Sequence, residues 1–177
     1  SSGTIMDFGG GTGLDLISYT NYKRVIFCEP SVAMRLEAKD RVTQQGLTNV
    51  VFLDDDQCDF RNWFLDKNAL ASENISAVIA NFAVINHIQD ISSFFKAMNV
   101  ILPSNTPLII NILHSNSFSK TKALSNKIRG LFKPREQQAA ALFPYTSAKL
   151  AKAAKPNFDI VNELVLGDER FHIIHFV

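Results

Sequence analysis

Residues 4–16, TIMDFGGGTGLDL, decide the fold of this chain. A short apolar segment ends at Asp7 and runs into Gly9, Gly11 and Gly13 before a new amphipathic segment begins. A strand that turns through glycines into a helix lets backbone N–H groups approach a ligand, because no side chain stands in between. The stretch therefore predicts the first strand of an α/β sheet and a ligand site at the turn that follows it.

The glycine spacing departs from the two common phosphate-binding turns. The dinucleotide fingerprint G-x-G-x-x-G requires its third glycine where this chain has Leu14, and Gly13 comes one residue too early. No Lys-Ser or Lys-Thr pair follows, although a P-loop requires one. Asp7 would also repel a phosphate, whereas it suits a cationic ligand that carries an ammonium and a sulfonium group.

The run D-x-G-x-G-x-G from Asp7 to Gly13 resembles motif I of the class I S-adenosylmethionine-dependent methyltransferases. A second predicted strand, residues 24–27, leads to Glu29, and an acid about 20 residues beyond the glycines binds ribose hydroxyls in doubly wound folds. The resemblance also implies that Asp56, four residues after Phe52 of a third strand, binds the adenine amino group. The cofactor that it implies is S-adenosylmethionine. The cofactor-binding residues that it implies are Asp7, Gly9, Gly10, Gly11, Gly13, Glu29, Pro30, Asp56, Gln57, Asn81 and Phe82.

Strands and helices alternate along the rest of the chain, which predicts parallel βαβ units. Two β-rich runs, residues 158–166 and 170–177, surround a tight turn and predict a final antiparallel hairpin. The family closes its sheet in this way. The resemblance therefore implies an α/β fold with a Rossmann-like doubly wound seven-stranded sheet, order 3-2-1-4-5-7-6 with an antiparallel last strand. The other predicted elements are strands at 49–53, 76–81 and 108–113 and helices at 32–45, 62–70 and 90–101.

Composition is that of an ordinary soluble protein of 177 residues, with 46% hydrophobic and 20% charged residues, and we expect one methyltransferase domain over 1–177. The net charge of +1 gives no bulk attraction to a polyanion. Two cysteines without a disulfide framework predict a reducing, cytoplasmic setting.

No apolar run approaches the ~18 residues of a membrane span, so we expect no membrane contact. Relatives usually carry helices before motif I, so we expect a longer natural chain, or a lid from elsewhere or from a partner subunit.

Methyl transfer is an in-line displacement, so the main task of the enzyme is to hold acceptor and methyl group in alignment. Candidate catalytic residues are His87, His114 and Tyr145, each with a packing role as the alternative. The loop ANFAVINHI, residues 80–88, lacks the N/D-P-P-Y pattern of enzymes that methylate amino groups of bases, and no Pro-Cys pair is present. Both features disfavour nucleic acid, and we expect a small-molecule acceptor. No spacing of His, Cys, Asp and Glu indicates a metal site.

Residues 114–149 form a basic segment between the fifth strand and the next helix, where this fold places substrate-recognition insertions. Leu124, Ile128 and Leu131 recur at helical spacing, which predicts an amphipathic helix. One interpretation is a positively charged lid that attracts an anionic acceptor, and the alternative is a solvated helix face. Two other functions stay open: a non-catalytic S-adenosylmethionine-binding regulatory or scaffold subunit, and a nicotinamide-dependent oxidoreductase, which Leu14 and the terminal hairpin disfavour. An oligomer is compatible with the sequence.

Overall fold

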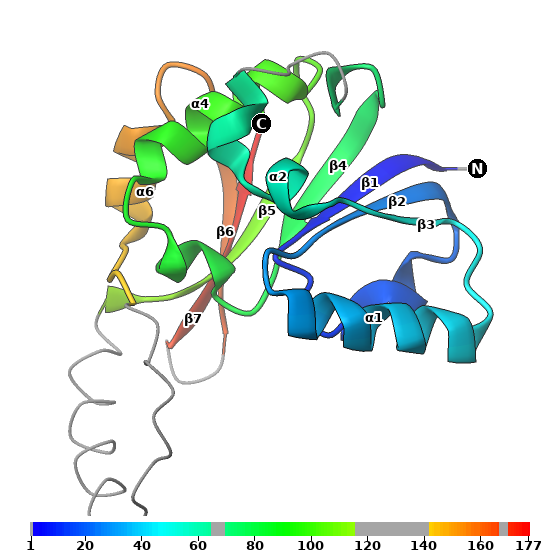
Figure 1. The fold of residues 1–177 in the computed structure, drawn as a ribbon. Helices are drawn as coiled ribbons and strands as arrows, with labels where there is room; N and C mark the ends of the chain where they lie inside the picture. Colours follow the sequence, from blue (N-terminus) through cyan, green and yellow to red (C-terminus); the bar gives the residue numbers. More distant parts are fainter. Residues whose placement is uncertain (1, 65–69, 116–141, 167–169) are drawn as a thin grey trace, which may run out of the picture.

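The structure is a computed structural model that describes residues 2–64, 70–115, 142–166 and 170–177. Its centre is a seven-stranded sheet of order β3-β2-β1-β4-β5-β7-β6 (Figure 1). β1, β2, β3, β4 and β5 are parallel, whereas β7 runs antiparallel to both β5 and β6. The predicted sheet order and antiparallel last strand are therefore confirmed. The strands are β1 Ser2–Phe8, β2 Tyr22–Cys28, β3 Val50–Phe52, β4 Ile75–Ala80, β5 Leu108–Leu113, β6 Ile160–Leu166 and β7 Phe171–Phe176.

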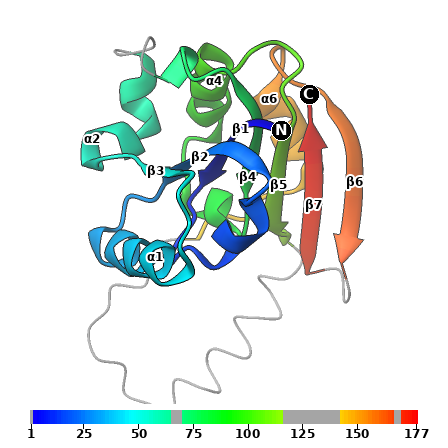
Figure 2. The same ribbon diagram turned by 90° about the vertical axis from the view of Figure 1, so that its right-hand side faces the viewer.

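The helices cover both faces of the sheet, with α1 on one side and α4 and α6 on the other (Figures 1 and 2). α1 begins where the Ser31 hydroxyl accepts the Met34 N–H, and it ends where Gly46 takes a left-handed φ of 63°. α4 begins in the same way, because the Asp90 carboxylate accepts the Ser93 N–H at 3.0 Å. The helical elements are η1 Leu14–Tyr19, α1 Val32–Gln45, α2 Asp55–Cys58, η2 Phe60–Phe64, η3 Val84–His87, α4 Ile91–Ile101 and α6 Ser147–Ala154.

The alternation of side chains along β1 and β2 divides the core into two clusters. Ile5, Val25 and Phe27 face η1 and α1, whereas Phe8 and Cys28 face η2 and α4. Asp7 follows the same alternation as Ile5, so its carboxylate lies on the α1 side beneath the glycine turn. At the carboxyl ends of the strands, the Asp7 side chain therefore lies on the α1 side of the sheet, and the Cys28 thiol lies on the α4 side.

Two predicted elements differ from the structure in part. The helix expected over residues 62–70 is represented by the 3-10 helix η2, and residues 65–69 lie outside the described residues. The segment after Gly13 is also a 3-10 helix, η1, rather than an α-helix. Of the basic segment 114–149, residues 116–141 lie outside the described residues, as does the turn at 167–169. None of the helices in the described part of the chain is long and apolar enough to cross a membrane.

Candidate active site

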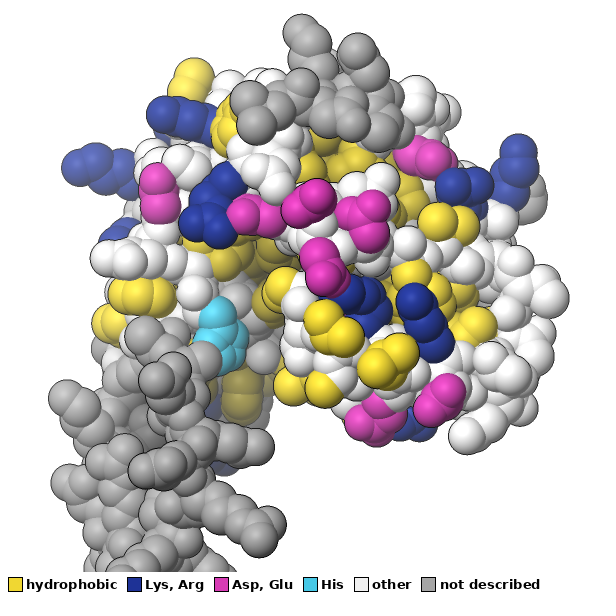
Figure 3. All heavy atoms as spheres, in the orientation of Figure 1, with side chains coloured by type: hydrophobic (Ala, Val, Ile, Leu, Met, Phe, Trp, Pro, Cys, Tyr) yellow, Lys and Arg dark blue, Asp and Glu magenta, His cyan; other side chains and the backbone are white. Residues whose placement is uncertain are grey.

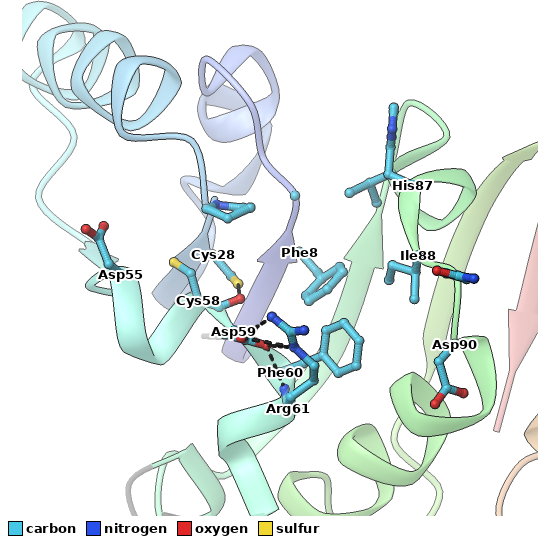
Figure 4. Close-up of a pocket in the computed structure, with 14 residues that line it drawn as sticks. Phe8, Cys28, Asp55, Cys58, Asp59, Phe60, Arg61, His87, Ile88 and Asp90 are labelled. Carbon is cyan, nitrogen blue, oxygen red and sulfur yellow. Dashed lines mark hydrogen bonds and ion pairs between the residues drawn. The ribbon is translucent and has the colours of Figure 1, made fainter. Parts of the chain in front are cut away.

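A cleft opens at the carboxyl ends of β1, β2 and β4, where open α/β sheets bind their ligands. It has two halves that share Gly9, Pro30, Val84 and His87. The glycine half has a volume of about 550 Å³ and the aromatic half about 600 Å³. The glycine half is lined by Gly9, Gly10, Gly11, Thr12, Leu14, Glu29, Pro30, Ser31, Met34, Asn81, Phe82, Val84 and His87. The aromatic half is lined by Phe8, Gly9, Cys28, Pro30, Asp55, Cys58, Asp59, Phe60, Arg61, Val84, His87, Ile88, Gln89 and Asp90 (Figure 4).

The turn after β1 leaves no room for side chains. The backbone N–H groups of Gly9 and Gly10 donate to the Cys28 carbonyl at 2.7 and 3.3 Å, which holds the turn against the tip of β2. A Cβ on Gly9 would lie 2.1 Å from a Val84 methyl group, and one on Gly10 would lie 2.2 Å from the Phe27 ring. Gly9 and Gly10 are therefore required by the packing of the turn, and both line the cleft.

Gly13 has a different task from the glycines ahead of it. Its φ is 76°, and a Cβ built on it would lie 3.0 Å from the Cβ of Ala38 in α1. It therefore allows the turn to pack closely against the helix, which is the role that the dinucleotide fingerprint gives to its third glycine. Gly13 does not line the cleft as the described residues define it.

Glu29 presents a fixed carboxylate to the glycine half. Its side chain is 6% exposed, and its two oxygens accept the backbone N–H groups of Gly11 at 2.9 Å and Ser31 at 2.8 Å. A carboxylate oxygen can accept a second hydrogen bond, so the group retains capacity for ligand hydroxyls. The predicted ribose acid thus lies at the predicted strand end, beside the glycine turn.

Asp7 lies directly beneath Gly10 rather than in the cleft. It is 1% exposed, and the described residues offer its Oδ2 atom no hydrogen-bond partner. A Cβ on Gly10 would come within 2.7 Å of that atom. Burial, together with the charges of Asp15 and Glu29, raises the pKa of Asp7 to about 7. The site therefore holds an acid that gains from a positive charge in the cleft.

The carboxylates after β3 divide between two tasks. Asp54 caps α2 by accepting the Gln57 N–H at 2.8 Å, while the Gln57 side chain accepts the Asp54 N–H at 3.1 Å. This capping box turns Asp55 toward the aromatic half, where it also pairs with Arg35. Asp56 and Gln57 line neither half of the cleft among the described residues, so their role at adenine stays a prediction. Acidic side chains gather in a row on this face of the molecule (Figure 3).

The loop after β4 forms the opposite wall of the glycine half. Asn81 donates from its amide to Asp15 at 2.7 Å, and Phe82 projects into solvent with 70% of its surface exposed. Phe82 and Ala83 both have a left-handed backbone, with φ of 53° and 60°. Non-glycine residues in this region are strained and cluster at ligand-binding sites. Both Asn81 and Phe82 line the cleft, as the sequence predicts.

Of the three predicted catalytic residues, the structure brings only His87 to the cleft. His87 is exposed and lies where the two halves meet. Tyr145 is 1% exposed and its hydroxyl donates to the Ile88 carbonyl at 2.5 Å, so it supports the cleft wall from behind. His114 stacks on His172, with ring centroids 4.2 Å apart, and it does not line either described half.

Asn86 is a supporting residue that the sequence reasoning missed. It is fully buried, and its amide donates to the carbonyls of Leu113 at 3.0 Å and Phe143 at 2.9 Å. Its oxygen accepts the Leu113 N–H at 2.9 Å. Asn86 thus joins η3 to the end of β5 and to the chain near Tyr145, and it fixes the backbone next to His87. The sequence signal is an asparagine between Ile85 and His87, in a segment that follows a buried strand.

The chain belongs to a methyltransferase domain family, because the model of that family matches residues 1–159. A solved S-adenosylmethionine-dependent methyltransferase from Clostridium acetobutylicum is 15% identical, with a TM-score of 0.70, and the match covers 99% of this chain and 84% of that one. A putative methyltransferase of Haloferax volcanii, solved with the Trm112 activator, is 10% identical with a TM-score of 0.75, covering 100% and 83%. Magnesium protoporphyrin IX methyltransferase of Synechocystis is 18% identical with a TM-score of 0.64, covering 99% and 74%. A search of the curated proteins finds no match.

A metal centre is not part of this site as described. Among the residues of the described ranges, no three His, Cys, Asp or Glu side chains lie close enough together to hold an ion. The polar groups that line the cleft among the described residues include the Glu29 carboxylate, the His87 imidazole and the thiols of Cys28 and Cys58.

Proposed function

We propose that this protein binds S-adenosylmethionine in the cleft and transfers its methyl group to a small-molecule acceptor. The observation that carries the proposal is the Glu29 carboxylate, held 2.9 Å from the N–H of Gly11 at the tip of β2. In a chain of the methyltransferase domain family, this acid stands where ribose hydroxyls can donate to it. The cofactor supplies an electrophilic methyl group on a sulfonium centre.

The residues of the cleft fit such a ligand in three respects. Glu29 offers free acceptor capacity to two hydroxyls. Gly10 allows the turn to pack directly on Phe27 and Asp7, and both Gly10 and Gly11 line the glycine half with backbone alone. The buried Asp7 carboxyl, without a partner at Oδ2 among the described residues, favours a cationic group above it. A pyrophosphate would instead be repelled by both acids.

The work of the chain in methyl transfer is positioning. The left-handed turn at Phe82 and Ala83, together with the contacts of Asn86 and Tyr145 behind it, holds the loop after β4 in place beside the cleft. A loop held in this way can position an acceptor in line with the methyl group, and such alignment is a large contribution to a reaction of this kind. We assign His87 the role of orienting the acceptor or of taking its proton, because it lies at the junction of the halves.

The acceptor is best described as a small molecule. The anionic preference suggested by the basic segment depends on side chains that fall mostly at 116–141, outside the described residues. Of its basic residues, Lys149 is described, and its ammonium lies 4.7 Å from the centre of the Tyr145 ring. An anionic acceptor therefore stays a prediction.

Calorimetric titration with S-adenosylhomocysteine tests the proposal. We expect Glu29→Gln to weaken binding by about 1–3 kcal/mol, because ribose hydroxyls lose a charged acceptor. The matched control is Glu73→Gln, which removes a carboxylate paired with Arg24, outside both halves of the cleft. Equal affinity in both variants, or preferential binding of NAD by the unmodified protein, would contradict the proposal. Binding without release of S-adenosylhomocysteine from S-adenosylmethionine over a panel of acceptors would indicate a non-catalytic subunit.

A further inference from the structure

Two thiols meet at the aromatic half of the cleft. Cys28 is the last residue of β2 and Cys58 is the last residue of α2, and both line this half (Figure 4). The Cys28 thiol donates to the Cys58 carbonyl at 3.7 Å, and the Cys58 thiol donates to the Leu53 carbonyl at 3.7 Å. Both are free, and they are the two cysteines of the chain. Methyl transfer as proposed above uses neither of them.

The pair is chemically asymmetric. The neighbouring Cys28 side chain lowers the pKa of Cys58, as does the nearby guanidinium of Arg35, whereas the Cys58 side chain and full burial raise the pKa of Cys28. A thiolate is the nucleophile toward peroxides, and a neighbouring thiol resolves the product. Cys58 therefore has the character of the attacking thiol, and Cys28 that of the resolving one.

We propose that Cys28 and Cys58 form a thiol modification site that small hydroperoxides convert to an intramolecular disulfide, and that this disulfide closes the cleft to its nucleoside cofactor. The second clause rests on the proposed function. In the first step the Cys58 sulfur attacks the terminal peroxide oxygen, the O–O bond breaks, and the other oxygen leaves as hydroxide or alkoxide and takes up the thiol proton, which gives a sulfenic acid. In the second step the Cys28 sulfur attacks the sulfenic sulfur, the S–S bond forms and water leaves. The peroxide is reduced by two electrons and the two thiols are oxidised by two.

The backbone of Cys28 connects the thiol pair to the glycine half. Its carbonyl accepts the N–H groups of both Gly9 and Gly10, so it holds the turn that borders the cofactor. A covalent bond between the two side chains ties this end of β2 to the end of α2 and constrains the carbonyl that holds the turn. Pro30, two residues after β2, and Cys58 both line the aromatic half, so we expect the bond to reshape this half as well. The oxidised protein therefore loses the shape that the nucleoside requires.

Treatment of the whole protein with hydrogen peroxide tests this inference. We expect loss of both free thiols and of two hydrogen atoms from the mass of the monomer, a peptide that joins Cys28 to Cys58, and at least tenfold weaker binding of S-adenosylhomocysteine. Dithiothreitol should restore both the thiols and the affinity. Prior saturation with S-adenosylhomocysteine should slow the oxidation.

Two variants separate the disulfide from other oxidative damage. Cys28→Ala and Cys58→Ser are each compared with themselves before and after peroxide, and we expect the affinity of each to stay unchanged by the treatment. The inference is overturned if the wild-type thiols persist, if the disulfide joins two chains, if Cys58 stops at a sulfinic acid, or if the disulfide leaves the affinity unaltered. If the reduced protein does not bind S-adenosylhomocysteine, the proposed function is contradicted. The number of free thiols and the mass of the monomer then still show whether peroxide forms the disulfide between Cys28 and Cys58.

Discussion

The carboxylate of Glu29 accepts the backbone N–H of Gly11 at 2.9 Å, although the two residues lie 18 positions apart. This bond joins the tip of β2 to the glycine turn after β1, so the acid and the turn are fixed relative to each other before any ligand arrives. A site that is already in its binding geometry loses little ordering free energy on binding. The backbone at Gly11 is therefore as much a part of the site as the carboxylate.

Replacement of Gly11 by alanine should lower both the free energy of unfolding and the affinity for the cofactor. A Cβ at Gly11 meets no atom within 4 Å, but its φ of +57° costs a non-glycine residue about 1–2 kcal/mol. Gly46→Ala is the matched control, since Gly46 has a φ of +63°, equally open surroundings and a place at the end of α1. Urea unfolding should show similar stability losses in both, while calorimetry should show weaker S-adenosylhomocysteine binding for Gly11→Ala alone. Equal affinities would mean that the turn does not touch the ligand.

Asp7 should make the protein less stable as the pH rises. Its pKa is about 7 in the folded protein against an ordinary value of 3.8, so the folded state holds a proton that the unfolded state has released. The free energy of unfolding therefore falls between about pH 4 and pH 7 and levels off above that range. Asp7→Asn removes this loss and should stabilise the protein at pH 8 by about 2–4 kcal/mol, with little effect near pH 4.

Chemical unfolding at a series of pH values checks this expectation. Asp40→Asn, at an exposed position of α1, serves as the control and should shift the stability by about 0.5 kcal/mol or less at every pH. A difference between wild type and Asp7→Asn that does not grow from pH 4 to pH 7 would show that Asp7 is ionised at its usual pKa.

Binding of S-adenosylmethionine should release a proton from Asp7. A cationic ligand in the cleft favours the ionised carboxylate and lowers its pKa from about 7. At pH 6 we expect close to one proton released per ligand bound, with affinity rising by up to about tenfold per pH unit and levelling off above pH 7. Calorimetry in two buffers of different ionisation enthalpy measures the released proton. The same release in Asp7→Asn would assign it to another group.

Much of the fold follows from local patterns in the sequence. The continuous apolar run at β4 predicts a central strand, and Ser31 and Gly46 mark the ends of α1 through capping chemistry that acts within a few residues. The position of Glu29 at the end of β2 was predictable from the apolar run before it, and its role at the ribose stays a prediction. These features depend on neighbours along the chain.

The parts of the site that escaped prediction depend on neighbours in space. Tyr145 is a plausible pocket residue in the sequence, but its hydroxyl reaches the Ile88 carbonyl, 57 positions away, and the residue is buried. A count from the aromatic residue of β3 selects Asp56, whose role at adenine stays a prediction, whereas Asp55 is the acid of this segment that lines the aromatic half of the cleft. Which of two adjacent acids lines a cleft depends on the local turn of the backbone, and the spacing along the sequence does not determine it.

Asn86 should contribute more stability than any exposed asparagine. Asn86→Ala leaves the N–H and carbonyl of Leu113 and the carbonyl of Phe143 without their side-chain partners, and unsatisfied buried groups are costly. We expect a loss of about 2–4 kcal/mol in urea unfolding. Asn162→Ala, at an exposed position of β6, should change the stability by about 0.5 kcal/mol or less. Similar losses in the two variants would mean that the backbone bond between Phe143 and Asn86, at 2.7 Å, holds this wall of the cleft without help from the side chain.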